Sequence, residues 1–279
     1  MLCAPAVFVM LAVTLYPLVY AVWLSLQRYD LRVPGAHEFV GLRNYLTVLS
    51  SNLWWKDFLA TAVITVTSVA IELVIGMALA MFMHRAIFGR RTVRTSILIP
   101  YGIITVVAAF AWQFAFTPDL GFVNTWLNTN TAWLTERSTS YLVITMTEVW
   151  KTTPFMSLLL LAGLAIVPEE LQEAAKVDGA TAWQRFTKVT LPTMKAAVLV
   201  ALLFRTLDAF RIFDTVFIQT KGANDTETLS FLGYNQLINR VNLGVGSAVS
   251  VLLFIAVILI AAVFVKGFNT DLGQVRGER

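Results

Sequence analysis

The sequence contains a single cysteine, Cys3, and only two histidines, His37 and His84. One cysteine excludes a disulfide within the chain and a zinc site built from cysteines. The two histidines lie far apart in segments that read as loops, so they give no basis for a histidine metal site. We therefore expect this chain to bind no metal.

Motifs for the common kinds of catalysis are also missing. The chain has no G-x-x-x-x-G-K-[ST] phosphate-binding loop, no G-x-S-x-G nucleophile turn and no H-E-x-x-H zinc motif. Its carboxylates are few, and most stand in loops or beside a basic residue. The sequence thus predicts neither an enzyme nor a cofactor site, and an energy source must lie outside the chain.

Charge is scarce throughout the sequence. Charged residues make up 14% and hydrophobic residues 57% of the chain, whereas a soluble domain has about 25% charged residues. The mean hydropathy of +0.71 indicates an all-α integral membrane protein. Apolar segments of about 20 residues are long enough to cross the hydrocarbon core as helices. Little sequence remains for a second domain, so we expect one transmembrane domain over residues 1–279. The six predicted transmembrane helices are Ala4–Leu26, Leu59–Met83, Val93–Phe116, Tyr141–Val167, Ala196–Gln219 and Val245–Val265.

The basic residues report topology, and the net charge of +4 does not indicate a nucleic-acid partner. Lys and Arg concentrate in cytoplasmic loops of membrane proteins. Here they are denser in residues 84–94, 168–195 and 266–279 than in the longer loops between these segments. We therefore expect a multi-pass protein of the cell membrane, with both termini and the 168–195 segment in the cytoplasm.

The segment 168–193 is polar and contains a glycine, although predicted spans flank it. Such backbone cannot face lipid, so the segment must lie in water at the membrane surface. Pro168 and the two glutamates after it suit the start of a helix. Asp178 and Gly179 form a turn or cap signal, and a second helical stretch is expected over Thr181–Val189. The pattern predicts a short helical hairpin that binds a cytosolic partner. An ordinary amphipathic loop is the alternative.

Ionisable residues within the predicted spans are costly and usually face the bundle interior or water. In the fourth span, Glu148 and Lys151 are three residues apart and are expected to pair on one helix face. The fifth span carries charges of alternating sign at three-residue steps, and we expect each to neutralise the next. These residues are Arg205, Asp208, Arg211 and Asp214.

Three interpretations of the intramembrane charges remain open. They form a structural network that joins helices or subunits, they line a solute path, or they relay ions or protons. The alternating signs argue against the relay, because paired carboxylates stay ionised. In the third span, Pro100-Tyr101-Gly102 predicts either a simple kink or a break that lines a cavity.

The residue order in segment 168–193 resembles the EAA loop of binding-protein-dependent ABC importer permeases. The pattern is E-A-A, two residues, D-G-A, a phenylalanine six residues later, and then L-P. The matching residues are Glu173, Ala174, Ala175, Asp178, Gly179, Ala180, Phe186, Leu191 and Pro192. In that family the loop forms a coupling helix that docks in a groove of the ATPase subunit. The resemblance therefore implies the type I ABC importer permease fold and an ATPase-coupling role for these residues.

Further segments resemble the carbohydrate branch of this family, which includes the larger maltose-permease subunit and the glycerol-phosphate permease A subunit. One departure is the run Lys221–Asp225, where members often have Gly-Gly-Pro. The motifs that carry the resemblance are Tyr16-Pro17, Gly41-Leu42-x-Asn44-Tyr45, Phe210-x-x-Phe213-Asp214 and Gly244-x-Gly246-Ser247-Ala248-x-Ser250.

The runs Leu98–Ile103, Val149–Met156 and Leu203–Arg211 resemble permease subunits of trehalose importers. The resemblance implies a second permease subunit, two cytoplasmic ATPase subunits that bind ATP and Mg, and an extracytoplasmic solute-binding lipoprotein. We expect the chain to form half of a translocation path for a sugar, with the disaccharide trehalose as the first candidate. Maltose or glycerol phosphate as the solute remains an alternative. So does an ion-coupled secondary transporter or channel, which would leave the EAA-like loop unexplained.

Overall fold

The structure, a computed structural model, describes residues 4–33, 35, 37–85 and 89–276, so Cys3 lies outside the described residues. Nearly all of its regular structure is helical, as the composition predicts. The elements are α1 (Ala4–Ser25), β1 (Gln27–Tyr29), β2 (His37–Phe39), α2 (Arg43–Leu49), α3 (Asn52–Arg85), α4 (Arg90–Gly102), α5 (Thr105–Ala115), α6 (Phe122–Leu127), α7 (Arg137–Leu164), α8 (Glu169–Val177), α9 (Ala182–Arg185), the π-helix η1 (Phe186–Thr190), α10 (Leu191–Thr193), α11 (Lys195–Ala209), α12 (Asp214–Gln219), α13 (Leu229–Tyr234), the π-helix η2 (Asn235–Asn239) and α14 (Leu243–Arg276).

Among the described residues, three helices are long and apolar enough to cross a membrane on their own. They are α1 over Phe8–Ser25, α3 over Asn52–Arg85 and α14 over Leu243–Gly267. Two bent pairs, α4 with α5 and α7 with α8, raise the number to five if each pair is one span. The chain is therefore a multi-pass helical membrane protein, and the sixth span remains a prediction.

The third predicted span bends sharply. Helix α4 ends at Gly102, α5 begins at Thr105, and the two axes meet at 86°. Ile103 between them has an extended backbone, with φ −78° and ψ 136°. The bend that Pro100-Tyr101-Gly102 predicts is thus confirmed, and it is a complete break of the helix.

The fifth predicted span is not one helix, which corrects the expectation of a continuous helix over Ala196–Gln219. Helix α11 ends at Ala209 and α12 begins only at Asp214. The unwound backbone between them is hydrogen-bonded from elsewhere, because the Thr228 hydroxyl donates to the Ile212 carbonyl at 3.0 Å. The interruption also breaks the expected row of charges on this helix.

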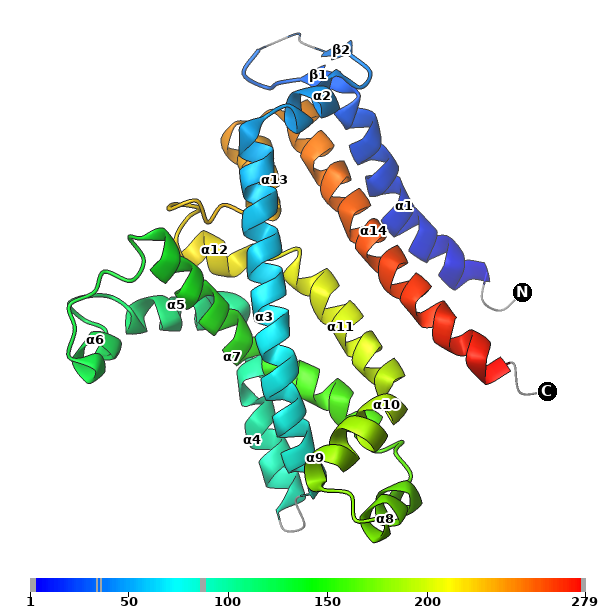
Figure 1. Cartoon of the computed structure of the whole chain (residues 1–279). Coiled ribbons are helices and arrows are strands. Elements are labelled where there is room, and N and C mark those ends of the chain that lie inside the picture. The colour runs from blue at the N-terminus through cyan, green and yellow to red at the C-terminus, as the bar shows by residue number, and fades with distance from the viewer. Residues whose placement is uncertain (1–3, 34, 36, 86–88, 277–279) are drawn as a thin grey trace.

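Helices α3, α7 and α11 form the centre of the bundle (Figure 1). Small residues allow close approach at their crossings, as is usual between membrane helices. A Cβ added to Gly76 of α3 would lie 2.9 Å from Cγ of Met156 in α7. A Cβ added to Gly163 of α7 would lie 2.5 Å from the Cβ of Ala197 in α11. These two contacts fix how closely α7 packs against both neighbours.

Helices α1 and α14 run side by side along one flank of the bundle, and the two short strands lie at one end of it (Figure 1). Strands β1 and β2 pair antiparallel, with Gln27 opposite Phe39. The Asn44 side chain donates to the carbonyls of Ser25 and Gln27 at 2.7 and 2.8 Å, which ties α2 to the end of α1. The sequence did not predict this hairpin. We call this end of the molecule the strand end.

Candidate coupling hairpin and intramembrane polar network

Residues 168–193 form a helical hairpin at the end of the molecule opposite the strand end (Figure 1). We call it the EAA hairpin. Its first arm, α8, ends in a Schellman motif, in which a left-handed residue closes the helix. The Ala180 amide donates to the Ala175 carbonyl at 2.9 Å and the Gly179 amide to the Lys176 carbonyl at 3.1 Å. Gly179 has φ +78°, so the turn or cap predicted at Asp178 and Gly179 is confirmed.

The second arm begins at a capping box. The Thr181 hydroxyl accepts from the Gln184 amide, and the Gln184 side chain accepts from the Thr181 amide at 2.8 Å. The helix then widens into η1, where the Leu191 amide bonds to the Phe186 carbonyl five residues back. Pro192 follows and has no amide hydrogen to continue the α-helical pattern, which favours such a local rearrangement. The predicted helix–break–helix order is therefore confirmed.

The family-motif residues of the EAA hairpin divide between solvent and bundle. Glu173 and Asp178 are exposed, whereas Phe186 is half-buried and packs against the apolar cluster of α3, α7 and α11. The Gln172 side chain donates to the Thr190 hydroxyl at 2.8 Å and joins the two arms. Phe186 thus fastens the hairpin to the membrane bundle. The remaining motif residues are exposed or half-buried: Ala174, Ala175, Gly179, Ala180, Leu191 and Pro192.

Large apolar side chains on this hairpin are exposed to solvent. Val177 is 88% exposed, Trp183 71% and Leu171 47%. The polar, broken backbone of the hairpin cannot face lipid, so contact with lipid does not explain the exposure of these side chains. An apolar surface rimmed by polar residues is typical of a protein-binding site.

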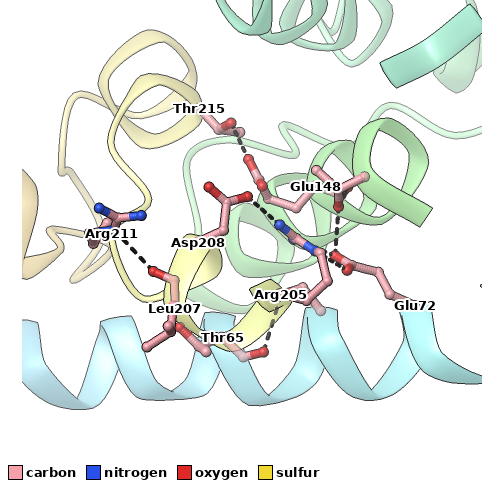
Figure 2. A network of polar contacts seen from close by, with 10 residues as sticks. Thr65, Glu72, Glu148, Arg205, Leu207, Asp208, Arg211 and Thr215 are labelled. Atoms are coloured by element: carbon pink, nitrogen blue, oxygen red, sulfur yellow. Dashed lines mark hydrogen bonds and ion pairs between the residues drawn. The ribbon is translucent and has the colours of Figure 1, made fainter. Parts of the chain in front are cut away.

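The intramembrane charges centre on Arg205 of α11, whose side chain is 1% exposed (Figure 2). Its guanidinium donates to both carboxylate oxygens of Glu72 in α3, with Nε–Oε2 at 2.6 Å and Nη2–Oε1 at 3.0 Å. The Thr152 hydroxyl of α7 also donates to Glu72, at 2.8 Å. One bidentate ion pair with an added hydroxyl therefore joins all three central helices.

Asp208 receives a further hydrogen bond from the Arg205 guanidinium (Figure 2). This pair is one of the neutralising steps that the three-residue spacing predicts, and it is confirmed. The Asp208 side chain is 66% exposed, whereas those of Arg205 and Glu72 are buried. The network therefore has a buried side on α3 and an open side at Asp208.

The other expected neutralising steps in this row of charges, those that involve Arg211 and Asp214, are wrong. Arg211 is exposed and its guanidinium donates to the Leu207 carbonyl at 3.1 Å, while Asp214 belongs to the next helix (Figure 2). Among the described residues, neither side chain forms an ion pair. The cause is the break after Ala209, because three-residue spacing brings side chains together only within one continuous helix.

The expected pair of Glu148 with Lys151 is also wrong. Glu148 is buried in α7 and accepts a hydrogen bond from the Thr215 hydroxyl of α12 (Figure 2). The Lys151 ammonium instead lies 5.6 Å from the ring centre of Tyr101, a cation–π distance. No ion pair joins the two residues in the part of the chain that the structure describes.

Tyr101 links Lys151 to a second aromatic side chain. Its ring stacks on that of Phe155, with centroids 5.3 Å apart. Tyr101 is 44% exposed and stands in the last turn of α4, before the 86° break. The Lys151, Tyr101 and Phe155 group thus presents an amino group and flat apolar rings from α4 and α7.

Sequence reasoning missed Glu72, Thr152 and Thr215. Glu72 lies inside the predicted span Leu59–Met83, and the rule that intramembrane charges need a partner would have found it. The two threonines carry no such signal, because hydroxyls are common in membrane helices. Nowhere in the described residues do three His, Cys, Asp or Glu side chains gather as metal ligands.

Comparisons with known proteins agree with this architecture. The trehalose transport system permease protein SugA of Mycobacterium tuberculosis (strain ATCC 25618 / H37Rv) is 54% identical over 96% of this chain and 88% of its own length. The trehalose/maltose transport system permease protein MalF of Thermococcus litoralis is 37% identical over 94% of this chain and 90% of its own.

Solved structures share the fold. A chain from a bacterial alginate ABC transporter, crystallised in complex with an alginate pentasaccharide-bound periplasmic protein, superposes with a TM-score of 0.81. The match covers 94% of this chain and 90% of the other at 19% identity. A second alginate-importer structure gives a TM-score of 0.80 at 20% identity. These likenesses establish the type I ABC importer permease fold.

The family model described as "binding-protein-dependent transport system inner membrane component" matches residues 72–272. That range includes Glu72, the whole EAA hairpin and α11. On this match and the relatives above, the chain belongs to the binding-protein-dependent transport system inner membrane component family, the permease subunits of ABC importers.

Proposed function

We propose that this permease carries a sugar, with trehalose as its first candidate, and is driven by a separate cytoplasmic ATPase that docks on the EAA hairpin. The names of the SugA and MalF relatives favour a disaccharide of this kind. The full assembly would contain a second permease subunit, two ATPase subunits that bind ATP and Mg, and an extracytoplasmic solute-binding lipoprotein. Both termini and the hairpin would then lie in the cytoplasm.

The exposed apolar side chains of the EAA hairpin are the observation that carries the ATPase proposal. Val177 and Trp183 are 88% and 71% exposed, and docking on a partner protein would remove them from water. The exposed carboxylate of Glu173 lies on the same arm as Val177 and is available for a basic group of the partner. The hairpin would therefore bind by apolar contact and take its orientation from charge.

Chain connectivity supplies a route from this hairpin to the membrane interior. The second arm continues through η1 and α10 into α11, and α11 carries Arg205. A displacement of the hairpin would thus act on the end of the helix that forms the ion pair with Glu72. Because α3, α7 and α11 meet at this pair, it would hold them together in one conformation and resist another.

The solute would pass the open side of the polar network. Asp208 offers a hydrogen-bond acceptor that is 66% exposed, and Lys151 offers a donor beside the rings of Tyr101 and Phe155. Hydroxyl groups of a sugar need such donors and acceptors, and flat rings suit the apolar faces of its pyranose units. Glu72 and Arg205 would position Asp208 without touching the solute.

The test is uptake of radiolabelled trehalose by cells that lack this gene and by cells that regain it, with maltose and glycerol phosphate as competitors. The gene is expected to restore uptake, and excess trehalose to compete most strongly. Affinity purification of the tagged chain is expected to recover an ATPase. Uptake that depends on an ion gradient and continues without ATP would contradict the proposal.

A further inference from the structure

Two adjoining cavities lie at the strand end of the molecule. The larger, of about 450 Å³, lies between α2, α13, η2 and the first turns of α3 and α14. The smaller, of about 320 Å³, lies between β1, α2 and α14. Thr47, Asn242 and Val245 line both, so the two cavities adjoin at these residues and are treated together as one site. The solute path and EAA hairpin proposed above use neither cavity.

Arginines border this site on both sides. Arg32 and Arg240 line the larger cavity, and Arg28 and Arg43 line the smaller. All four side chains are exposed. Within the described residues, only Arg32 of these four forms an ion pair, with Asp30 at 2.6 Å. We call these four residues the arginine rim.

The nearby carboxylates do not neutralise the rim. Arg32 holds the pKa of Asp30 at about 2, so Asp30 stays ionised and keeps Arg32 paired. Glu38 lies opposite Arg28 in the strand register. Even with both carboxylates counted, the guanidiniums of Arg43 and Arg240 have no acidic partner among the described residues. The rim therefore carries excess positive charge.

The larger cavity crosses the boundary between loop and membrane span. Of its polar lining, Arg240 and Asn242 precede the span of α14, whereas the half-buried Val245 lies within that span. Leu53, which is also half-buried, lies within the span of α3. A ligand with a polar anionic group at one end and an apolar chain at the other would suit both parts of this lining.

We propose that this site binds a phospholipid, with the headgroup phosphate on the arginine rim and the first acyl methylenes along the half-buried side chains of Leu53 and Val245. Guanidinium groups bind phosphate oxygens through paired hydrogen bonds. Two membrane spans, those of α1 and α14, end beside the rim at Ser25 and Leu243, and span ends lie at headgroup depth. A soluble anion would use the rim and leave the apolar half of the cavity empty.

Native mass spectrometry of the detergent-purified chain with added phosphatidylglycerol tests this site. The variant Arg43→Gln/Arg240→Gln removes the two rim charges that have no carboxylate opposite them and is expected to weaken retention of one lipid by about tenfold or more. The matched control is Lys56→Gln/Arg137→Gln, which removes two exposed cations that lie beside Asp225 and line neither cavity. Its lipid retention is expected to stay within about twofold of the parent.

Two further arms separate a lipid from a free anion. Val245→Trp fills the part shared by both cavities without altering charge, and it is expected to reduce lipid retention while gel filtration shows an intact monomer peak. Inorganic phosphate at millimolar concentration is expected not to displace the lipid. Displacement by phosphate, or unchanged retention in both the charge and the Val245 variants, would overturn the proposal.

Discussion

The guanidinium of Arg205 and the carboxylate of Glu72 form a two-point ion pair between positions 133 residues apart in the sequence. Both side chains are almost entirely buried, at 1% and 0% exposure. The attraction between buried charges offsets their desolvation only while both partners are present. Removal of either one should therefore cost far more than the pair contributes when intact.

Glu72→Ala is expected to destabilise the protein by about 3–5 kcal/mol, because it leaves the Arg205 charge buried without its main partner. The measurement is the yield and thermal unfolding of detergent-extracted protein. Asp208→Ala should cost less, since the Asp208 carboxylate is 66% exposed and screened by solvent.

A double-mutant cycle separates this ion pair from a general effect of mutation. Glu72→Leu/Arg205→Met removes both charges and is expected to recover most of the yield that either single change loses. The control cycle is Asp208→Ala with Arg211→Ala, whose side chains form no ion pair with each other in the described residues; it should be additive. Strict additivity in the Glu72–Arg205 cycle would show that the pair has no energetic role.

Gly179→Val is expected to disturb the EAA hairpin through its backbone alone. The residue has φ +78° and an added Cβ would meet no atom within 4 Å, so a clash is not the cause. A left-handed conformation costs a non-glycine residue about 1–2 kcal/mol and a β-branched one more. ATP-dependent uptake should fall while membrane insertion stays normal. Gly179→Asn, which tolerates this conformation better, should retain more activity; equal activity in both variants would contradict the explanation.

Glu173→Ala should leave the stability of the isolated chain within about 0.5 kcal/mol of the parent, because the side chain is exposed. If the EAA hairpin binds the ATPase as proposed, the same change should weaken co-purification of that subunit. Glu170→Ala on the same helix is the control for loss of one negative charge. If the Glu173 variant assembles with the ATPase and turns over as the parent does, this carboxylate is an ordinary solvated residue.

Gly163→Leu is expected to force α7 and α11 apart, since even a Cβ at this position would lie 2.5 Å from that of Ala197. Overpacking of this kind costs about 1–3 kcal/mol. The thermal midpoint of the purified protein should fall. Gly163→Ala combined with Ala197→Gly should recover part of the loss shown by Gly163→Ala alone, and no recovery would mean that the crossing is not the limiting contact.

Sequence reasoning worked where a structure depends on neighbouring residues. The turn at Gly179, the second helical stretch after Thr181 and the bend after Pro100 all follow from local chemistry. The type of residue at each position limits the backbone there whatever the rest of the chain does. These features could therefore be predicted one segment at a time.

The polar network could be predicted only in part, because its partners come from different helices. The Arg205–Asp208 pair is local and was expected. The roles of Glu72 and Thr215 depend on how α3 and α12 pack against α7 and α11. The break after Ala209 carries no proline or glycine signal; a hydroxyl from Thr228 supports it, and such a contact exists only in the folded chain.

The short length and high charge of α11 also affect how the protein is made. Its 15 residues extend about 22 Å, less than the roughly 30 Å of the hydrocarbon core. A charge at the centre of an isolated helix disfavours its transfer from the translocon into lipid by about 2.5–3.5 kcal/mol, and α11 carries the buried charge of Arg205. Glu72 is synthesised earlier and reaches the membrane first. Helix α11 therefore has its counter-ion in place when it emerges, and its insertion depends on helices that the ribosome has already delivered.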